Sequence, residues 1–251
     1  MKHSERKHLK TNEFANAIGH ANDWRAENQS RITLTVVAVV VSAAGVLGYV
    51  AWRNSVDTKA RALLAEAMVV YEAPVQPAPA PSLEAAGNET PAAPAPPAAG
   101  TYPTERAKLE AALPKLLTAA DEYPSSDPGQ MARYHAAAAL VGLGRFDEAV
   151  TQYDRVIDEG SGLMAQMARL GKAEAQLRAS QYDAAIASFS ELSNRADTGV
   201  PKEAMLMELA RAYRLAGKND DARKTLTQVV EQHADSPFAS EAKAELEKIK
   251  G

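Results

Sequence analysis

Internal repetition constrains this chain more than any other feature of its sequence. The segment Gly144–Ala149 recurs as Ser180–Ala185 and again as Gly217–Ala222, at offsets of 36 and 37 residues. Repetition at a period of about 20–50 residues is typical of chains built from stacked supersecondary units. The residues around each copy have helical rather than alternating periodicity. We therefore predict an all-α solenoid in which each unit is a pair of antiparallel helices.

The repeated positions indicate how the helices of a unit would pack. Small residues keep their register on both sides of the turn, and a large apolar residue follows one turn later. Small residues let two helices approach closely, and the large residue fills the gap to the next unit. The three aligned sets are Ala137, Ala173 and Ala210; Ala149, Ala185 and Ala222; and Tyr153, Phe189 and Leu226.

Glycine marks the turn in two of the three copies. Gly144 and Gly217 suit the left-handed position that ends the first helix, because glycine has no Cβ to clash there. Ser180 stands at the same position in the middle copy. We expect a less relaxed turn at Ser180.

A closing helix is predicted after Asp235. Ser236 can cap it, and Pro237 fits its first position. Its expected inner face is Phe238, Ala242, Leu246 and Ile249. Its expected outer face is charged, as the exposed end of a solenoid requires, and contains Glu241, Lys243, Glu245, Glu247, Lys248 and Lys250.

Residues 32–52 form a 21-residue stretch with no charge and no proline. A helix of that length spans about 31 Å, which matches a hydrocarbon core of about 30 Å. The alternative is a cleaved signal peptide, but the preceding polar stretch and the apolar run are both long for one. We therefore expect a single retained transmembrane helix ahead of the solenoid.

The orientation of that helix is weakly encoded. Positive residues close to the span slightly favour the carboxyl side, whereas the whole amino-terminal tail carries six of them against three. A long carboxyl-terminal domain crosses largely regardless of nearby charge. We expect an inner-membrane, single-pass protein with its carboxyl-terminal domain in the periplasm or outside the cell.

Composition divides the chain further. Residues 73–103 contain nine prolines and ten alanines, which favours an extended linker or insert without a core of its own. The expected division is a polar segment (1–31), the membrane helix (32–52), a helix continuing from it (53–72), the linker (73–103), and the repeat domain with its closing helix (104–251).

Several classes of function lack their residues. The chain has no cysteine, which excludes disulfides and thiolate sites. Its net charge is −4 with no basic stripe, so we expect no nucleic-acid binding. The five histidines show no ligand spacing, and His135 is expected to be a packing or groove residue in an alanine-rich helix. We expect neither an enzyme nor a cofactor or metal site.

The repeated residues resemble tetratricopeptide repeats, with the best match in the third unit (Leu206, Leu209, Ala210, Tyr213, Gly217, Ala222 and Leu226). The first two units depart from the pattern, because Arg133, Arg169 and Lys172 occupy positions that are usually apolar.

The whole architecture also resembles one family, the ancillary SecYEG translocon subunit, which is related to the repeat domain of the cell-division coordinator of the envelope. The resemblance rests on residues 23–28 before the span and on 52–55 and 56–61 after it. It implies that 56–72 packs on 104–123 as a first repeat, with the linker looping out. The alternative is a stalk helix and a separate repeat domain that starts near residue 104.

The repeat resemblance also implies a groove, since the first helices of such units line a concave surface. The candidate groove residues are Met131, Tyr134, Met167, Leu170, Arg178, Met207, Arg211 and Arg214. Methionine adapts its shape and arginine grips carboxylates or carbonyls, which suits loosely specific binding of proteins or peptides.

These features predict a membrane-anchored scaffold for protein–protein interactions in the bacterial envelope. The family resemblance implies translocon subunits or periplasmic chaperones as partners. The alternative function is a self-associating organiser of the envelope or of cell division, which would form homo-oligomers.

Overall fold

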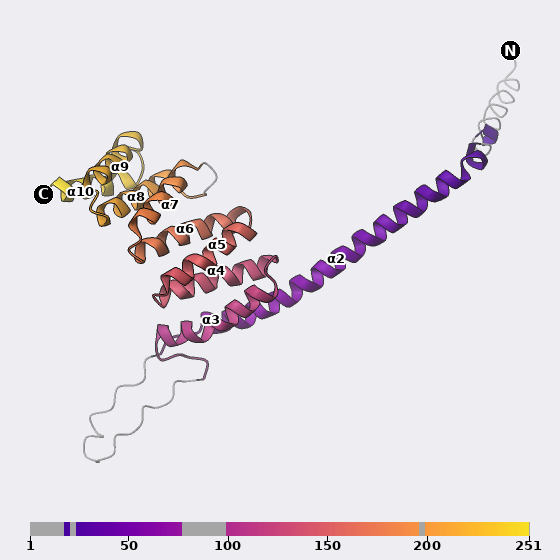
Figure 1. Ribbon diagram of the computed structural model, residues 1–251, viewed down its shortest axis with the longest axis horizontal. Coiled ribbons are helices and arrows are strands. Elements are labelled where there is room, and N and C mark those ends of the chain that lie inside the picture. Colours follow the sequence, from indigo (N-terminus) through magenta and orange to yellow (C-terminus); the bar gives the residue numbers. More distant parts are fainter. Residues whose placement is uncertain (1–17, 21–23, 77–98, 196–198, 251) are drawn as a thin grey trace, which may run out of the picture. The chain divides into compact units, whose positions relative to one another are not determined.

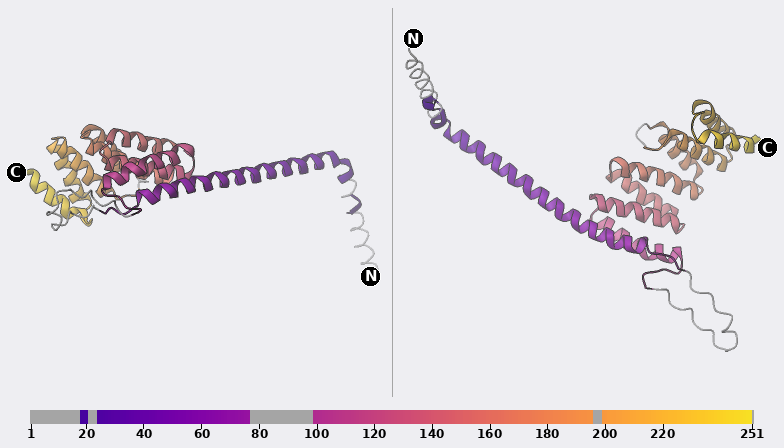
Figure 2. Two further views of the ribbon diagram at one scale, coloured as in Figure 1. Left: turned by 90° about the horizontal axis from the view of Figure 1, so that it is seen from below. Right: turned by 180° about the vertical axis from the view of Figure 1, so that it is seen from behind.

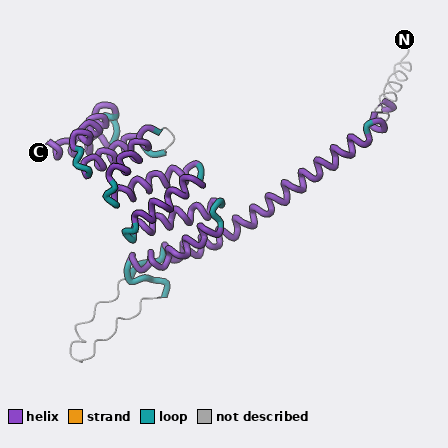
Figure 3. Tube along the Cα trace, viewed as in Figure 1, coloured by secondary structure: helices purple, strands orange, loops and turns teal. Residues whose placement is uncertain are grey.

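The structure is a computed structural model that describes residues 18–20, 24–76, 99–195 and 199–250. These residues are helical apart from turns, loops and one isolated parallel bridge between Val75 and Tyr102 (Figures 1 and 3). The long helices are α2 (Gln29–Tyr71), α3 (Glu105–Glu122), α4 (Asp127–Gly142), α5 (Phe146–Glu159), α6 (Gly162–Arg178), α7 (Tyr182–Asn194), α8 (Lys202–Leu215), α9 (Asn219–Gln232) and α10 (Phe238–Lys250). The predicted all-α fold class, with a long apolar helix near the amino terminus, is confirmed.

The chain divides into two compact units, Met1–Ser55 and Val56–Gly251. Most of the predicted polar segment 1–31 and of the linker 73–103 lies outside the described residues. In the first unit, the apolar part of α2 has a mean hydropathy of 2.3, and none of this window is buried. This stretch is long and apolar enough to cross a membrane, as a signal sequence can also be.

The carboxyl-terminal turns of α2 belong to the second unit and pack on α3. Ala67 is fully buried in a cluster with Leu109 and Leu113 of α3, and Glu66 forms an ion pair with Lys115. These contacts favour the arrangement in which 56–72 pairs with 104–123. The described ends of the proline-rich segment meet at the bridge, where the Gln76 amide donates to the Tyr102 carbonyl at 2.9 Å.

From α3 to α10, each helix packs on the next in chain order, and Figure 2 shows these layers from two further directions. The turns after α4, α6 and α8 close with the same hydrogen bonds. In each turn, the amide that follows the left-handed residue bonds to a carbonyl five positions back, as Arg145 does to Leu140 at 2.9 Å. Gly144 and Gly217 have φ of 77° and 75°, as predicted.

Ser180 takes the same left-handed conformation, with φ of 60°. A side chain at this φ crowds its own backbone, so the turn after α6 is strained where the other two are not. The expectation of a less relaxed turn at this position is confirmed.

The repeat packing is built from small residues facing larger ones. Ala137, Ala173, Ala149, Ala185 and Ala222 are fully buried, and Ala210 nearly so. The large residues that follow, Tyr153, Phe189 and Leu226, are buried as well. Two hydrophobic clusters result and meet at α6, which gives Ala168 and Ala175 to one and Ala173 and Leu177 to the other.

Arg133 appeared in the sequence as a departure from an apolar position, and the structure buries it. Its guanidinium donates to the Ala120 carbonyl at 2.9 Å and to the Gln152 side chain at 3.0 Å, and it forms an ion pair with Asp121 at 3.0 Å. The carbonyls in the last turn of a helix lack partners within that helix. Arg133 thus closes the end of α3 while it crosses to α5. Lys172 is satisfied similarly, by Asp154 of α5 at 2.6 Å.

The closing helix α10 packs as predicted on its inner face. Ala242 is fully buried in the second hydrophobic cluster, and Phe238, Leu246 and Ile249 pack against that cluster. The Ser236 hydroxyl accepts from the Phe238 amide at 3.2 Å. The outer face differs from the expectation, because Glu241 and Glu245 line a cavity against α8.

Candidate functional site

The structure places the predicted groove residues on α4, α6 and α8, the first helices of the successive hairpins, and separates them into three groups. Met131 and Met167 occupy equivalent positions in successive units, and each is 40 % exposed. Tyr134, Leu170 and Met207 are also equivalent, but they are half-buried and pack against the two hydrophobic clusters. Arg178, Arg211 and Arg214 are exposed. Methionine and arginine therefore remain available on this surface, whereas the second group serves largely as core.

Acidic residues interleave with these arginines. Glu208 on α8 pairs with Arg211 at 3.5 Å. Glu174 on α6 has a raised pKa because of desolvation between the helices and then repulsion from Glu208, which Arg178 and Arg211 partly offset. The predicted groove set left out Glu174 and Glu208, because the sequence did not show that carboxylates on two first helices would face each other.

An aromatic cluster continues the surface toward the amino-terminal side of the repeats. The rings of Tyr71 and His135 lie 5.2 Å apart, and Tyr134 contacts both His135 at 5.8 Å and Tyr153 at 5.7 Å. Burial raises the pKa of all three tyrosines. It lowers the pKa of His135, against the opposing effect of Glu72. His135 is therefore a neutral packing residue at neutral pH.

Gly171 makes room for this cluster on α6. A Cβ at that position would lie 2.5 Å from the Tyr153 ring, well inside van der Waals contact. Tyr153 of α5 thus packs directly on the α6 backbone. This glycine is the sequence signal that could have indicated the close approach, since the equivalent positions of the other units carry larger residues.

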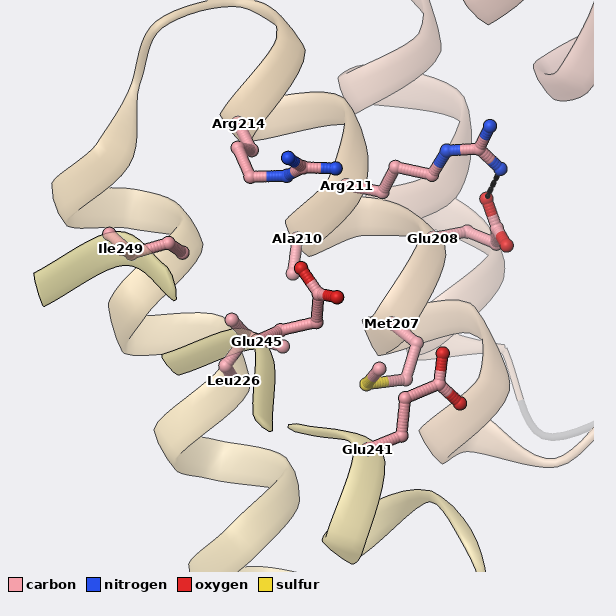
Figure 4. A pocket seen from close by; sticks show the side chains of 9 residues that line it. All are labelled: Met207, Glu208, Ala210, Arg211, Arg214, Leu226, Glu241, Glu245 and Ile249. Carbon is pink, nitrogen blue, oxygen red and sulfur yellow. Dashed lines mark ion pairs between the residues drawn. The ribbon is translucent and has the colours of Figure 1, made fainter. Parts of the chain in front are cut away.

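A cavity of about 260 Å³ lies at the other end of the surface, between α8, α9 and α10 (Figure 4). Its apolar lining comes from Met207, Ala210, Leu226 and Ile249. Its charged lining comes from Glu208, Arg211, Arg214, Glu241 and Glu245. No group of three or more His, Asp or Glu residues that could hold a metal occurs in the parts of the chain that the structure describes.

Two tetratricopeptide-repeat family models match the region whose geometry is given above. One matches residues 105–162 and 134–201, and the other matches 176–246, so that together they span more than half of the chain. The chain belongs to the tetratricopeptide-repeat family. The repeats that the 36- and 37-residue offsets indicated are therefore shown, including the two units that carry Arg133, Arg169 and Lys172.

Solved structures similar to this tetratricopeptide-repeat chain were also found. A putative kinesin light chain repeat protein described as from Podosopora anserina is 18% identical, with 57% of this chain and 77% of that chain covered and a TM-score of 0.47. A variant of the same protein matches equally. A MamA RS-1 ArsTM double mutant matches at 18% identity over 57% of this chain and 85% of that chain, with a TM-score of 0.39. No curated protein matches this chain.

Tetratricopeptide repeats are protein–protein interaction scaffolds, and proteins of this family are generally not enzymes. Membership of the family thus assigns the chain a general role in binding proteins.

Proposed function

We propose that this chain is a single-pass membrane anchor carrying a repeat domain that binds polypeptide segments along α4, α6 and α8. The observation that carries the proposal is the pair of equivalent, exposed methionines Met131 and Met167 on successive first helices. Core packing does not account for an exposed methionine, and its flexible thioether suits varied partner side chains. The arginines beside them supply contacts to carboxylates and carbonyls of the same segment.

Membrane attachment is proposed from α2. Residues 32–52 carry no charge, Arg31 and Arg53 flank them, and Tyr49 and Trp52 stand at the carboxyl-side end, where aromatic side chains favour a membrane interface. The large hydrophobic side chains of this stretch are exposed, with Leu34 at 72% and Leu47 at 70%. We assign the anchor to the inner membrane and the repeat domain to its outer side.

The partners that we propose are secretion-channel subunits or the chaperones that receive secreted chains. Support comes from the segments that flank the span, residues 23–28, 52–55 and 56–61, which resemble those of the ancillary translocon subunit family. A loosely specific groove beside the membrane suits the handling of chains that emerge unfolded.

Site-specific photocrosslinking in native membranes tests this proposal. A photoreactive amino acid replaces Met131 or Met167 in turn, and matched controls replace Thr151 of α5 or Ala187 of α7, which are exposed on second helices. We expect crosslinked translocon subunits or chaperones from the two methionine positions and none from the controls. Equal yields from all four positions, or no such partner from any, would contradict the proposal.

Self-association is the second candidate function. It is favoured by the small residues on the exposed face of α2, where Ala38 and Ser42 are one helical turn apart and nothing within 4 Å would meet a Cβ at Gly45 or Gly48. Small residues at this spacing let two membrane helices approach closely. Crosslinks between two copies of this chain in the same membranes would favour this alternative.

A further inference from the structure

The cavity between α8, α9 and α10 has an unusual lining for the end of a solenoid. One stripe of α10 (Phe238, Ala242 and Leu246) packs into the core. A second stripe, Glu241, Glu245 and Ile249, recurs every four residues and faces α8 across the cavity. Carboxylates at the inner edge of a closing helix leave a hollow that apolar side chains would have filled, so the packing gives no reason for them.

Ion pairing accounts for some of the charges around this cavity but not for all of them. Arg211 pairs with Glu208 at 3.5 Å, and Glu245 pairs with Lys248 at 2.5 Å. Arg214 and Glu241 have no ion pair or hydrogen bond among the described residues. Arg214 acts on Glu245 only through space, helping to lower the pKa of that carboxyl group after the larger effect of Lys248. One cation and one anion on the rim thus remain open to a ligand.

The two open charges stand toward opposite ends of the cavity. In Figure 4, Met207 and Glu241 lie toward one end, and Arg214 and Ile249 lie toward the other. Arg214 follows Met207 by seven positions on α8, which is about 10 Å along the helix axis. An extended polypeptide covers about 10 Å in three residues. The two charges are therefore spaced to meet side chains three positions apart on one extended segment.

The floor between these charges is apolar. Ala210 and Leu226 are buried beneath it, and Met207 and Ile249 border it. A volume of about 260 Å³ can hold one medium-sized apolar side chain together with part of its backbone. An apolar residue between the two charged ones would fill the hollow that α10 leaves.

We propose that this cavity binds an extended polypeptide segment with an acidic and a basic residue three positions apart and an apolar residue between them. Arg214 receives the acidic side chain, Glu241 receives the basic one, and Ala210 and Leu226 form the floor under the apolar one. The site gives the segment a direction, because reversing its two charges places like charges together at both ends. This inference rests on the proposed function, of which it specifies one subsite.

Fluorescence anisotropy with the full chain in detergent micelles tests the subsite. Two fluorescein-labelled dodecapeptides are compared, with cores Glu-Leu-Ala-Lys and Lys-Leu-Ala-Glu between identical alanine-rich flanks, and a third peptide replaces both charges with glutamine. We expect the chain to prefer one charged peptide over the other two by about three- to fivefold for each ion pair lost. Replacing leucine by serine in the preferred peptide should weaken its binding further.

The deciding variant is the double charge reversal Arg214→Glu with Glu241→Arg, which should switch the preference to the other peptide. The matched control, Lys243→Glu with Glu231→Arg, also keeps the net charge, reverses two exposed residues outside the cavity lining, and should leave the preference unchanged. Circular dichroism confirms that each variant is folded.

Equal binding of the charged peptides by the native chain, or the same preference after the cavity reversal, would overturn the inference, as would no binding of any peptide. If the crosslinks at Met131 and Met167 still form in that event, the proposed function stands without this subsite. If the preference switches but no crosslinks form, the subsite stands and the proposed partners do not.

Discussion

At the scale of single residues, the three turns of the repeats provide an internal comparison. Gly144, Ser180 and Gly217 share a left-handed backbone and the same hydrogen bonds, yet only Ser180 carries a side chain. A left-handed conformation costs a residue with a Cβ about 1–2 kcal/mol. The middle turn therefore stores strain that the other two avoid.

Replacing Ser180 by glycine should stabilise the repeat domain by about 0.5–1 kcal/mol, because relief of this strain exceeds the extra entropy that glycine gives the unfolded chain, about 0.4–1 kcal/mol. The exposed hydrogen bond from Tyr182 to Ser180 is long, at 3.3 Å, and adds little. Urea unfolding followed by circular dichroism measures the change. Gly144→Ser is the reverse control and should destabilise by a similar amount. A Ser180→Gly variant less stable than the native chain would contradict this explanation.

His135 should make stability depend on pH. Burial lowers its folded-state pKa below the ordinary value of 6.5, so the unfolded chain binds more protons as pH falls through 6.5. Stability should therefore be fully present above pH 6.5 and should decrease on acidification toward the lowered pKa. The raised pKa of Glu174 acts in the opposite sense at lower pH.

The His135→Phe variant keeps a ring beside Tyr71 and removes the titration. Urea midpoints of the native and variant chains should therefore shift relative to each other as pH falls from neutral through this window, with the native chain losing stability that the variant keeps. Parallel curves across that range would show that His135 is not desolvated in the folded chain.

At the scale of elements, the two helices of each unit approach through small residues. In the third unit, Ala210 of α8 and Ala222 of α9 are both buried, and we predict that they face each other where the helices cross. Ala222→Leu adds three carbons to this interface and should cost roughly 1–3 kcal/mol through overpacking.

The same substitution at Ala244, which is exposed on α10, should change stability by no more than about 0.5 kcal/mol. Helix propensity largely cancels between the two variants, since both replace an alanine within a helix. Urea unfolding measures both. Equal stabilities for the two variants would mean that the repeat register is wrong, and the groove assignment depends on that register.

Sequence periodicity predicted the hairpins well because it reports contacts between neighbouring elements. The aligned alanines, the two glycines and the inner face of α10 all lie where the repeat pattern indicates. Arg133 was harder to interpret, because its burial depends on Asp121, Gln152 and the end of α3, which no local pattern connects. Glu241 and Glu245 were expected to face outward, since the sequence does not specify how far α10 is rotated against α8.

At the scale of the whole molecule, the apolar part of α2 and the repeat domain make separate demands. Hydrophobic side chains exposed along α2 require a membrane or a partner helix, because soluble proteins rarely expose large contiguous apolar patches. The repeats from α3 to α10 bury two hydrophobic clusters of their own. The proposed location and partners both require the α2 anchor to be retained.

Fractionation of cells that express the full chain tests this requirement most directly. Alkaline carbonate extraction should leave the full-length chain in the membrane pellet, and protease added to intact spheroplasts should digest the repeat domain from outside. A variant lacking residues 32–52 should be recovered in the soluble fraction. Recovery of the native chain as a shortened soluble protein would instead show that 32–52 is a cleaved signal segment, and would contradict the membrane-anchored scaffold.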